Sequence, residues 1–467
     1  MNGPQEPIAP PAMAANGLAG PGPAGPTAES PGHRLRRLLA DAAVAVALLI
    51  ALGIVFALDR SATGTSSDFA QRFASSHTIF DVLRTPIAEV REDPKRQRWI
   101  GAFGGTEASE AAVRLGLDWL ARHQAGDGHW GPDCLHLAPQ GRCRAPQPCS
   151  GGGSGHRIAQ TSLAILAFQA AGHYDFNDNE YSARVKRGLD WLLQNQRADG
   201  CFLDLGRGAL SPNMYEHGIA TFALADACEM ADSSDREPAD RYRQAAQKAI
   251  RFIQYSQHND GGWRYTDERE LPSDTSVSGW QVLAMKAAKR AKIVAVNPEC
   301  VAKVEDFFKR CEMPQPGRTG YMPGHAPSDA TTGVGMLVHE FILEKPDSPL
   351  VQAGAKYLAG EAQRAWKGEA ARKPRFAARS GNFYTWYNCT LAMFLAGGEP
   401  WKQWNDVVRD HLVALQHRVP ESCANGSWWD PDDEYSLEGG RIYSTALAAL
   451  TLEVYYRYKS GAAQVYR

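Results

Sequence analysis

Ionisable and aromatic side chains recur near the beginning of long apolar segments, and they are the clearest candidates for chemistry in this chain. The segments are rich in Ala, Leu, Val and Thr, and they span residues 158–171, 217–230, 276–288, 331–343, 384–396 and 443–456. If the segments pack side by side as helices, polar side chains at their starts can face a common interior. The residues expected to line it are Glu216, His217, Trp280, Asp329, Tyr384, Trp386, Tyr387, Arg441 and Tyr443, with His156 and Asp274 at two further segment starts.

An interior of this kind suits a hydrocarbon ligand. Aromatic faces stabilise cations, and an apolar pocket with few polar groups binds a largely apolar molecule. Two alternatives stay open at these positions. Trp280 and Trp386 fill a core as readily as they line a cavity, and Asp274 is a natural N-cap for the helix that follows it.

A second pattern lies between the apolar segments and predicts the helices that position them. An aromatic residue is followed by Gln five residues later, Gly four further on and an aromatic two beyond that. Such a helix ends in a turn whose glycine adopts a left-handed conformation. Three copies keep this spacing: Trp119, Gln124, Gly128 and Trp130; Trp191, Gln196, Gly200 and Phe202; and Phe252, Gln257, Gly261 and Trp263.

A late copy contains an insertion between Gln416 and the pair Gly426 and Trp428. Residues 301–312 and 350–366 are interpreted as degenerate copies that lack the Gly-x-Trp ending. Paired with the apolar segments, these copies give six outer and six inner helices. A single helix pair cannot bury its apolar face, so the pairs must stack. The predicted fold is all-α, an (α/α)6 toroid of six outer and six inner helices.

The repeat resembles the QW repeat of terpenoid cyclases, in which a basic residue and Gly precede an aromatic–aliphatic pair, Gln and Gly-x-Trp. Arg187, Gly188, Trp191, Gln196 and Gly200 match this order. The resemblance is to the terpenoid cyclase and protein prenyltransferase superfamily, nearest to the squalene-hopene cyclase-like branch, over residues 111–458. It implies that the repeats clamp the outer wall and that any chemistry takes place inside the ring.

Two activities of that superfamily can be compared with this sequence. Cyclases that protonate an alkene carry Asp-x-Asp-Asp-Thr, and the matching stretch here, residues 271–275, has Ser273 at the donor position and keeps only Asp274 and Thr275. Asp274 is therefore the one catalytic candidate. Prenyltransferases hold zinc through Asp-x-Cys and a later His, and the matching residues 274–276 and 382–385 contain neither Cys nor His.

The sequence therefore favours a lipid- or partner-binding scaffold with degenerate catalytic motifs. Two enzymatic functions stay open as alternatives. An active squalene-type cyclase that uses Asp274 is the first alternative. The second is an extracytoplasmic glycan-active enzyme, which needs facing carboxyls such as Glu216, Asp274 and Asp329. No cofactor is expected. The net charge is -2, so no nucleic-acid partner is expected either.

The region ahead of the repeats predicts a membrane anchor. Residues 1–32 are a Pro/Ala/Gly-rich tail expected to be disordered, residues 33–60 a single transmembrane helix, residues 61–105 a stem and residues 106–467 the toroid. A cleaved signal or a buried helix are the alternatives for the apolar stretch. Arg34, Arg36 and Arg37 predict a cytoplasmic amino terminus and an extracytoplasmic ring at the cell membrane.

Nine cysteines are present, and three of them, Cys134, Cys143 and Cys149, lie in one Gly/Pro-rich loop. Their separations are wider than the tight spacing of structural zinc sites. A loop disulfide, unpaired thiols and zinc stay open as alternatives, and no metal is included in the expected site.

Overall fold

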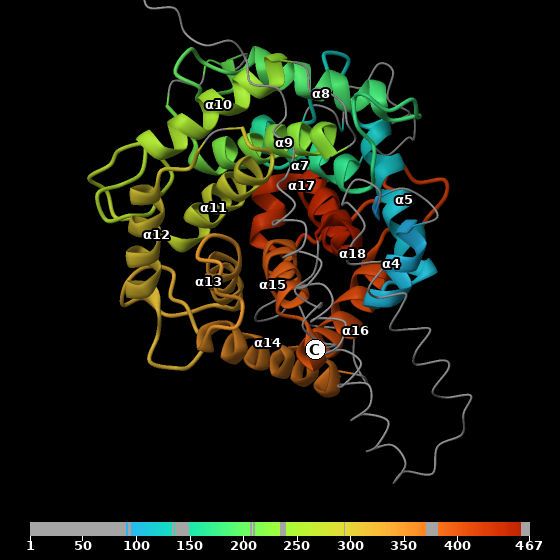
Figure 1. Ribbon diagram of the computed structural model, residues 1–467. Helices are drawn as coiled ribbons and strands as arrows, with labels where there is room; N and C mark the ends of the chain where they lie inside the picture. The colour runs from blue at the N-terminus through green and yellow to red at the C-terminus, as the bar shows by residue number, and fades with distance from the viewer. Residues whose placement is uncertain are drawn as a thin grey trace, which may run out of the picture. The chain divides into compact units, whose positions relative to one another are not determined.

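The computed structural model describes the chain at residues 90–91, 95–132, 135, 149–205, 208, 211–233, 240–293, 295–369 and 382–458. These described residues, with all their helices, belong to one compact unit. Twelve of these helices form two concentric layers (Figure 1). The all-α toroid predicted from the sequence is confirmed.

The inner layer consists of the apolar segments. Each inner helix contacts the next one along the chain, and the last, α17, contacts the first, α7, so the layer closes (Figure 1). Their surfaces are buried almost all round because helices flank them on both sides. The inner helices are α7 (Arg157–Ala170), α9 (Met214–Ser233), α11 (Thr275–Arg290), α13 (Asp329–Phe341), α15 (Phe383–Ala396) and α17 (Glu434–Leu452).

The outer layer consists of the repeat helices, including the two degenerate copies. They bury one face against the inner ring and expose the other, as amphipathic helices must. The outer helices are α5 (Glu107–Arg122), α8 (Ser182–Gln194), α10 (Asp240–Tyr255), α12 (Pro298–Cys311), α14 (Pro349–Glu369) and α16 (Gly398–Leu415).

Where the repeat keeps its glutamine, that side chain ties one outer helix to the next. Gln196 Nε2 donates to the carbonyl of Gly200 in its own turn, at 3.1 Å, and to that of Ala245 on α10, at 2.9 Å. Gln124 and Gln257 make the equivalent pairs of bonds. Gly200 has a φ of 98° and lies so close to the backbone of Lys248 that a Cβ would collide with it. The repeat therefore joins neighbouring outer helices through the backbone.

The closing aromatic of each repeat packs between the two layers. Trp130, Phe202 and Trp263 are fully buried. Trp263 Nε1 donates to the carbonyl of Ile253 at 2.8 Å, and its backbone N–H donates to Ser278 Oγ on α11 at 2.9 Å. Each such residue thus fixes an outer helix to the start of the following inner helix.

Part of the predicted stem packs against helices of the ring. Helix α4 (Lys95–Phe103) contacts the short carboxy-terminal helix α18 (Val454–Arg457), and Trp99 is buried. Arg91 is also buried and donates to Asp226, Tyr174 and the carbonyl of Arg457. The charged residues of this segment obscured its apolar face in the sequence, because Arg91 is buried and Arg96 partly buried, and each pairs with a carboxylate.

No helix within the described ranges is long and apolar enough to cross a membrane. The predicted tail, residues 1–32, and the predicted span, residues 33–60, lie outside those ranges.

Candidate functional site at the inner-helix starts

A histidine between two carboxylates joins the starts of α7, α9 and α17. His156, the residue before α7, places Nδ1 2.8 Å from Glu216 Oε1 and Nε2 3.0 Å from Glu438 Oε1. The hydrogen bond to Glu216 and the charges of both carboxylates raise the pKa of His156 to about 9, against the opposing effect of burial. An imidazolium held in this way is a charged clamp between three inner helices.

Asp274 precedes α11 and combines helix capping with complete burial. Its Oδ1 accepts a hydrogen bond from Val277 N at 2.8 Å, which is N-cap geometry, and the residue is 0% exposed. Its Oδ2 lies 3.8 Å from Arg264 Nε. Burial raises the pKa of Asp274 to about 6, although the capped amide, the Tyr321 hydroxyl and Arg264 act to lower it. A minor fraction of this carboxyl is therefore protonated at neutral pH.

Ser273, next to Asp274, is held by a carboxylate in the turn of the third repeat. Its Oγ donates to Asp260 Oδ1 at 2.5 Å, and its backbone N–H donates to Asp260 Oδ2 at 2.8 Å. Ser273 is fully buried. The two hydrogen bonds fasten the segment ahead of α11 to the turn that ends α10.

Six tyrosines gather near Asp274 and the neighbouring helix starts, and they are called the tyrosine rim. The hydroxyls of Tyr265 and Tyr321 lie 3.1 Å apart, and the Tyr265 and Tyr215 rings lie 6.0 Å apart. The Tyr384 and Tyr435 rings are also 6.0 Å apart, and Asp274 interacts electrostatically with both Tyr215 and Tyr384. The rim consists of Tyr215, Tyr265, Tyr321, Tyr384, Tyr435 and Tyr443.

Two contacts cross the interior of the inner ring. Trp280 on α11 stacks on Tyr387 of α15, with ring centroids 5.6 Å apart and planes 11° apart. Tyr384 of α15 donates its hydroxyl to the carbonyl of Ser276 on α11 at 3.4 Å. Since α13 separates these two helices in the ring, both contacts span it. Trp280 and Tyr387 are buried, so they form part of the core as well as the inner surface.

His217 lies between the two helix layers, not on the ring interior where the sequence placed it. Its Nδ1 accepts from the backbone N–H of Phe202 at 3.3 Å, and Nε2 lies 3.1 Å from the carbonyl of Ala249 on α10. These two bonds require Nε2 to carry the proton. His217 stands where Ser278 stands in the next repeat, so its position is that of a structural residue.

Trp386 and Asp329 also contact the outer layer. The Trp386 ring meets His411 of α16 edge-on, with centroids 5.1 Å apart. Asp329 accepts a hydrogen bond from the hydroxyl of Tyr357 on α14 at 3.0 Å and lies 3.6 Å from Arg318. Both were predicted to line the interior, and the helical period does not by itself distinguish the two buried faces of an inner helix.

Arg441 lies among the loops that join the first and last repeats. Its Nε donates to the carbonyl of Ser150 at 2.8 Å, one terminal nitrogen donates to Ser427 Oγ at 3.0 Å, and the guanidinium lies over the Trp429 ring. Cys149 is next to Ser150, while Cys134 and Cys143 lie outside the described residues.

Sequence reasoning missed Glu438, Asp260 and Tyr321. Glu438 belongs to the first turns of α17, ahead of a kink at Gly440, and the predicted apolar segment began only at residue 443. Asp260 precedes the repeat glycine Gly261 and is not one of the spaced repeat residues, and Tyr321 belongs to a loop without a motif. One signal was present: Glu438 precedes Gly439 and Gly440, which indicate a break in the helix.

Comparison with known families finds two matches, each to a part of the chain. Residues 100–209 match the model of the squalene-hopene cyclase C-terminal domain. A squalene–hopene cyclase of Bradyrhizobium diazoefficiens is 32% identical over 100 residues, which are 21% of this chain and 13% of that cyclase. With the ring fold, these findings support a terpenoid cyclase-like α/α toroid superfamily for this chain. Within that superfamily, the sequence matches are to squalene-hopene cyclases.

Solved structures share the fold at low identity. An α-1,6-mannanase of Salegentibacter is 8% identical, with a TM-score of 0.50, over 75% of this chain and 99% of that chain. An α-amylase of Clostridium perfringens is 9% identical, with a TM-score of 0.50, over 74% and 97%. A variant of the type II terpene cyclase MstE of Scytonema is 14% identical, with a TM-score of 0.45, over 74% and 96%. At these identities the likeness to the mannanase and the amylase concerns the fold alone.

Proposed function

We propose that this protein is a membrane-anchored ring that binds an isoprenoid or other apolar lipid at the inner-helix starts. The observation that carries the proposal is a set of exposed apolar and aromatic side chains near the inner-helix starts, two of which belong to the tyrosine rim. Large apolar and aromatic side chains between 41% and 56% exposed lie ahead of α9 and α11 and in the first turn of α17. Exposed apolar groups that cluster around a polar centre are typical of a ligand entrance. They are Leu205, Tyr265, Leu271, Tyr435 and Leu437.

The helix-start geometry favours binding over cyclisation. An alkene is protonated only by a strong acid, and the residue at the donor position, Ser273, has a hydroxyl that is held by Asp260. Asp274 accepts a hydrogen bond from a helix N-terminus, which stabilises the ionised form. The motif is therefore degenerate in its geometry as well as in its residues.

An active cyclase that uses Asp274 is the second candidate, because burial raises the pKa of this carboxyl to about 6. Buried carboxyls with raised pKa values serve as general acids in enzymes. The rim tyrosines would stabilise a cationic intermediate through their ring faces. This candidate requires that Asp274 transfers its proton to a bound alkene.

A glycan-active ring has less support, although two solved rings of this fold are named as glycan-active enzymes. Glycoside hydrolysis needs two carboxyls on either side of the scissile bond. Glu216 is held by His156, and Asp329 interacts with Arg318 and Tyr357. Both carboxylates are therefore engaged in structural contacts with neighbouring side chains.

The proposed membrane anchor is the apolar segment at residues 33–60. The basic residues at its start place the amino terminus in the cytoplasm and the ring on the other side of the membrane in this proposal. Protease added to spheroplasts should remove the ring and leave a tag at the amino terminus intact. If the tag is cut while the ring is protected, the orientation is the reverse of the one proposed.

Lipid binding is tested with the purified chain in detergent, by melting with and without squalene and with geranylgeraniol. A ligand at 100 times its Kd stabilises the folded state by about 2.7 kcal/mol, so binding should raise Tm. Tyr435→Ser and Leu437→Ser at the entrance should reduce this shift. The matched controls Tyr255→Ser and Leu415→Ser remove exposed side chains from the ends of outer helices. An equal reduction in the controls, or no shift with the wild type, would exclude this entrance.

A further inference from the structure

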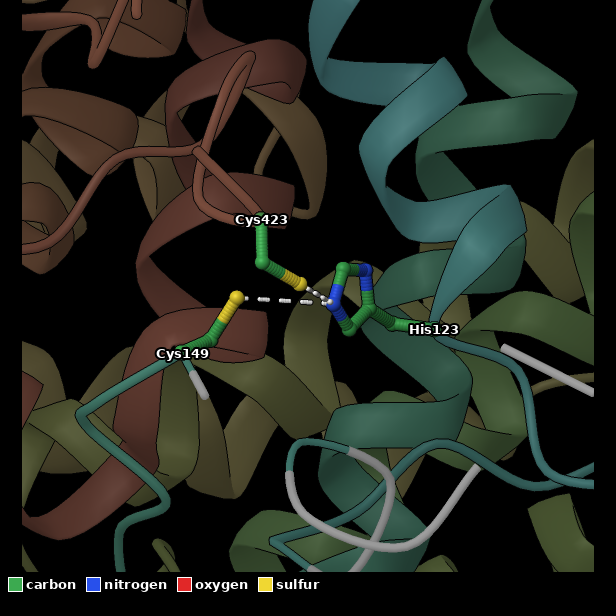
Figure 2. A group of neighbouring side chains, drawn as sticks. All are labelled: His123, Cys149 and Cys423. Atoms are coloured by element: carbon green, nitrogen blue, oxygen red, sulfur yellow. Dashed lines mark hydrogen bonds between the residues drawn. The ribbon is translucent and has the colours of Figure 1, made fainter. Parts of the chain in front are cut away.

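His123, Cys149 and Cys423 form a cluster of metal-ligating side chains outside the site at the inner-helix starts (Figure 2). One potential ligand atom from each residue lies within 4.8 Å of the other two. Figure 2 shows both sulfur atoms directed toward the same ring nitrogen of His123. His123 and Cys149 are buried and Cys423 is partly buried, so the cluster lies within the fold.

The distances fit a tetrahedral zinc ion. His123 Nε2 is 3.5 Å from Cys149 Sγ and 3.4 Å from Cys423 Sγ. Zinc bonds of about 2.0–2.1 Å to nitrogen and about 2.3 Å to sulfur, at a tetrahedral angle, place these two atoms about 3.6 Å apart. The protein therefore holds the histidine nitrogen close to the separation that zinc requires from each sulfur, with the two sulfurs within 4.8 Å of each other.

The tautomer of His123 is also the one that a zinc ligand needs. Its Nδ1 lies 2.7 Å from the carbonyl oxygen of Trp119, an acceptor, so Nδ1 must carry the proton of the neutral ring. Nε2 then presents its lone pair to the two sulfurs. A ring nitrogen that donates to a backbone carbonyl while the other binds metal is the usual second-shell arrangement of zinc-bound histidine. Trp119 stacks on the imidazole, with centroids 4.1 Å apart, and fixes its plane.

The three residues come from the first and last parts of the ring. His123 follows the first outer helix, Cys149 precedes the first inner helix, and Cys423 lies in the insertion of the last repeat. Other bonds cross the same seam: Trp119 Nε1 donates to the carbonyl of Cys423 at 3.0 Å, and Arg122 donates to that of Asn425 at 2.8 Å. A metal here would link segments 300 residues apart in the chain.

We propose that His123, Cys149 and Cys423 bind a zinc ion that closes the toroid at this seam. The three residues supply three of the four ligands of a tetrahedral site. Binding replaces two thiol protons by Zn²⁺ and releases both protons to solvent. The guanidinium of Arg441 interacts electrostatically with both cysteines. The sequence left zinc open for the loop that contains Cys149, and the sequence alone did not connect that loop with Cys423, which is distant in the chain.

The direct test is the metal content of the full chain purified without added metal, by inductively coupled plasma mass spectrometry. The proposal expects one zinc per chain, and Cys149→Ser, Cys423→Ser and His123→Gln should each lose it. Loss of a ligand should weaken metal binding by at least the ~10–100-fold seen for second-shell changes. Cys300→Ser is the matched control, because Cys300 is a buried cysteine on α12 that lies outside the cluster. It should keep the zinc.

A second measurement uses only the wild type, in case the variants fail to fold. Cobalt added to the apoprotein should give the thiolate-to-cobalt charge-transfer band of a tetrahedral site, and zinc should displace it. Chelation should lower Tm, since the ion binds only the folded state. A zinc-free chain that shows no cobalt band would overturn the proposal. So would a Cys149–Cys423 disulfide found by mass spectrometry of the chain from its own compartment.

Discussion

Gln416 donates its side-chain amide to the backbone carbonyl of Ala112 at 2.8 Å, although 304 positions separate the two residues in the chain. The same nitrogen donates to the carbonyl of Gly426 at 2.9 Å. Gln196 makes the corresponding pair of bonds to the outer helix that follows it. The last repeat is therefore bonded to the first outer helix in the way that Gln196 bonds its own helix to the following one. This bond closes the row of repeats into a ring.

Replacing Gln416 by Ala should destabilise the ring by about 1–3 kcal/mol, because two buried carbonyls lose their donor. The free energy of unfolding from chemical denaturation measures this effect. Gln352→Ala, on the exposed face of α14, is the control and should stay within about 0.5 kcal/mol of wild type. Equal stability of the two variants would mean that this bond does not contribute to closure.

Trp263→Ala should cost about 3–5 kcal/mol, as is typical when a buried aromatic side chain is deleted. Trp263 is 0% exposed and bonds to both the preceding outer helix and the following inner helix. Tyr255→Ala removes a largely exposed aromatic from the same repeat and should have little effect. Unchanged melting of Trp263→Ala would show that the repeat does not clamp the two layers.

The ring could be predicted from the sequence because its signals are local and repeated. Trp119, Gln124 and Trp130 identify an outer helix and its turn by spacing alone, and the same spacing recurs. Even the degenerate copies at α12 and α14 followed from the need to pair each inner helix. The buried segment around Arg91 did not follow, because its partner Asp226 is 135 positions away.

The site was harder to predict because an inner helix is buried on two faces. The spacing of apolar residues does not show which buried face of an inner helix points to the ring interior and which contacts the outer layer. His217 was therefore assigned to the interior, although it bonds to the outer layer. The proposed zinc site was also hidden in the sequence, because its residues are far apart in the chain. Cys149 was recognised as a candidate, but His123 and Cys423 join it only after the ring closes.

Stability should fall as pH rises through the alkaline range, because of the His156 clamp. The pKa of His156 is raised from 6.5 to about 9 in the folded state. The folded protein therefore binds more protons than the unfolded chain between these values. The stabilisation is complete below pH 6.5 and is lost as pH rises through about 9. Denaturation of wild type and His156→Gln across this range should give converging stabilities, and parallel curves would contradict the clamp.

Asp274 should affect stability with the pH dependence of a buried acid. Its pKa is raised to about 6, so ionisation in the folded state destabilises the ring as pH rises from about 4 to 6. Asp274→Asn keeps an N-cap and avoids the buried charge, so it should match or exceed wild type at pH 8. Asp274→Ala should lose about 1 kcal/mol with the cap. A large loss in the Asn variant would show that the charge itself stabilises the fold.

The most direct measurement follows the fate of a bound isoprenoid. Purified protein is incubated with squalene at pH 6 and pH 8, and the extract is analysed by gas chromatography with mass spectrometry, beside Asp274→Asn. A binding ring with Ser273 at the donor position should return squalene unchanged in every sample, while the thermal shift shows that the lipid was bound. Cyclised product from the wild type, more abundant at pH 6 and absent from Asp274→Asn, would contradict this account and make Asp274 the catalytic acid.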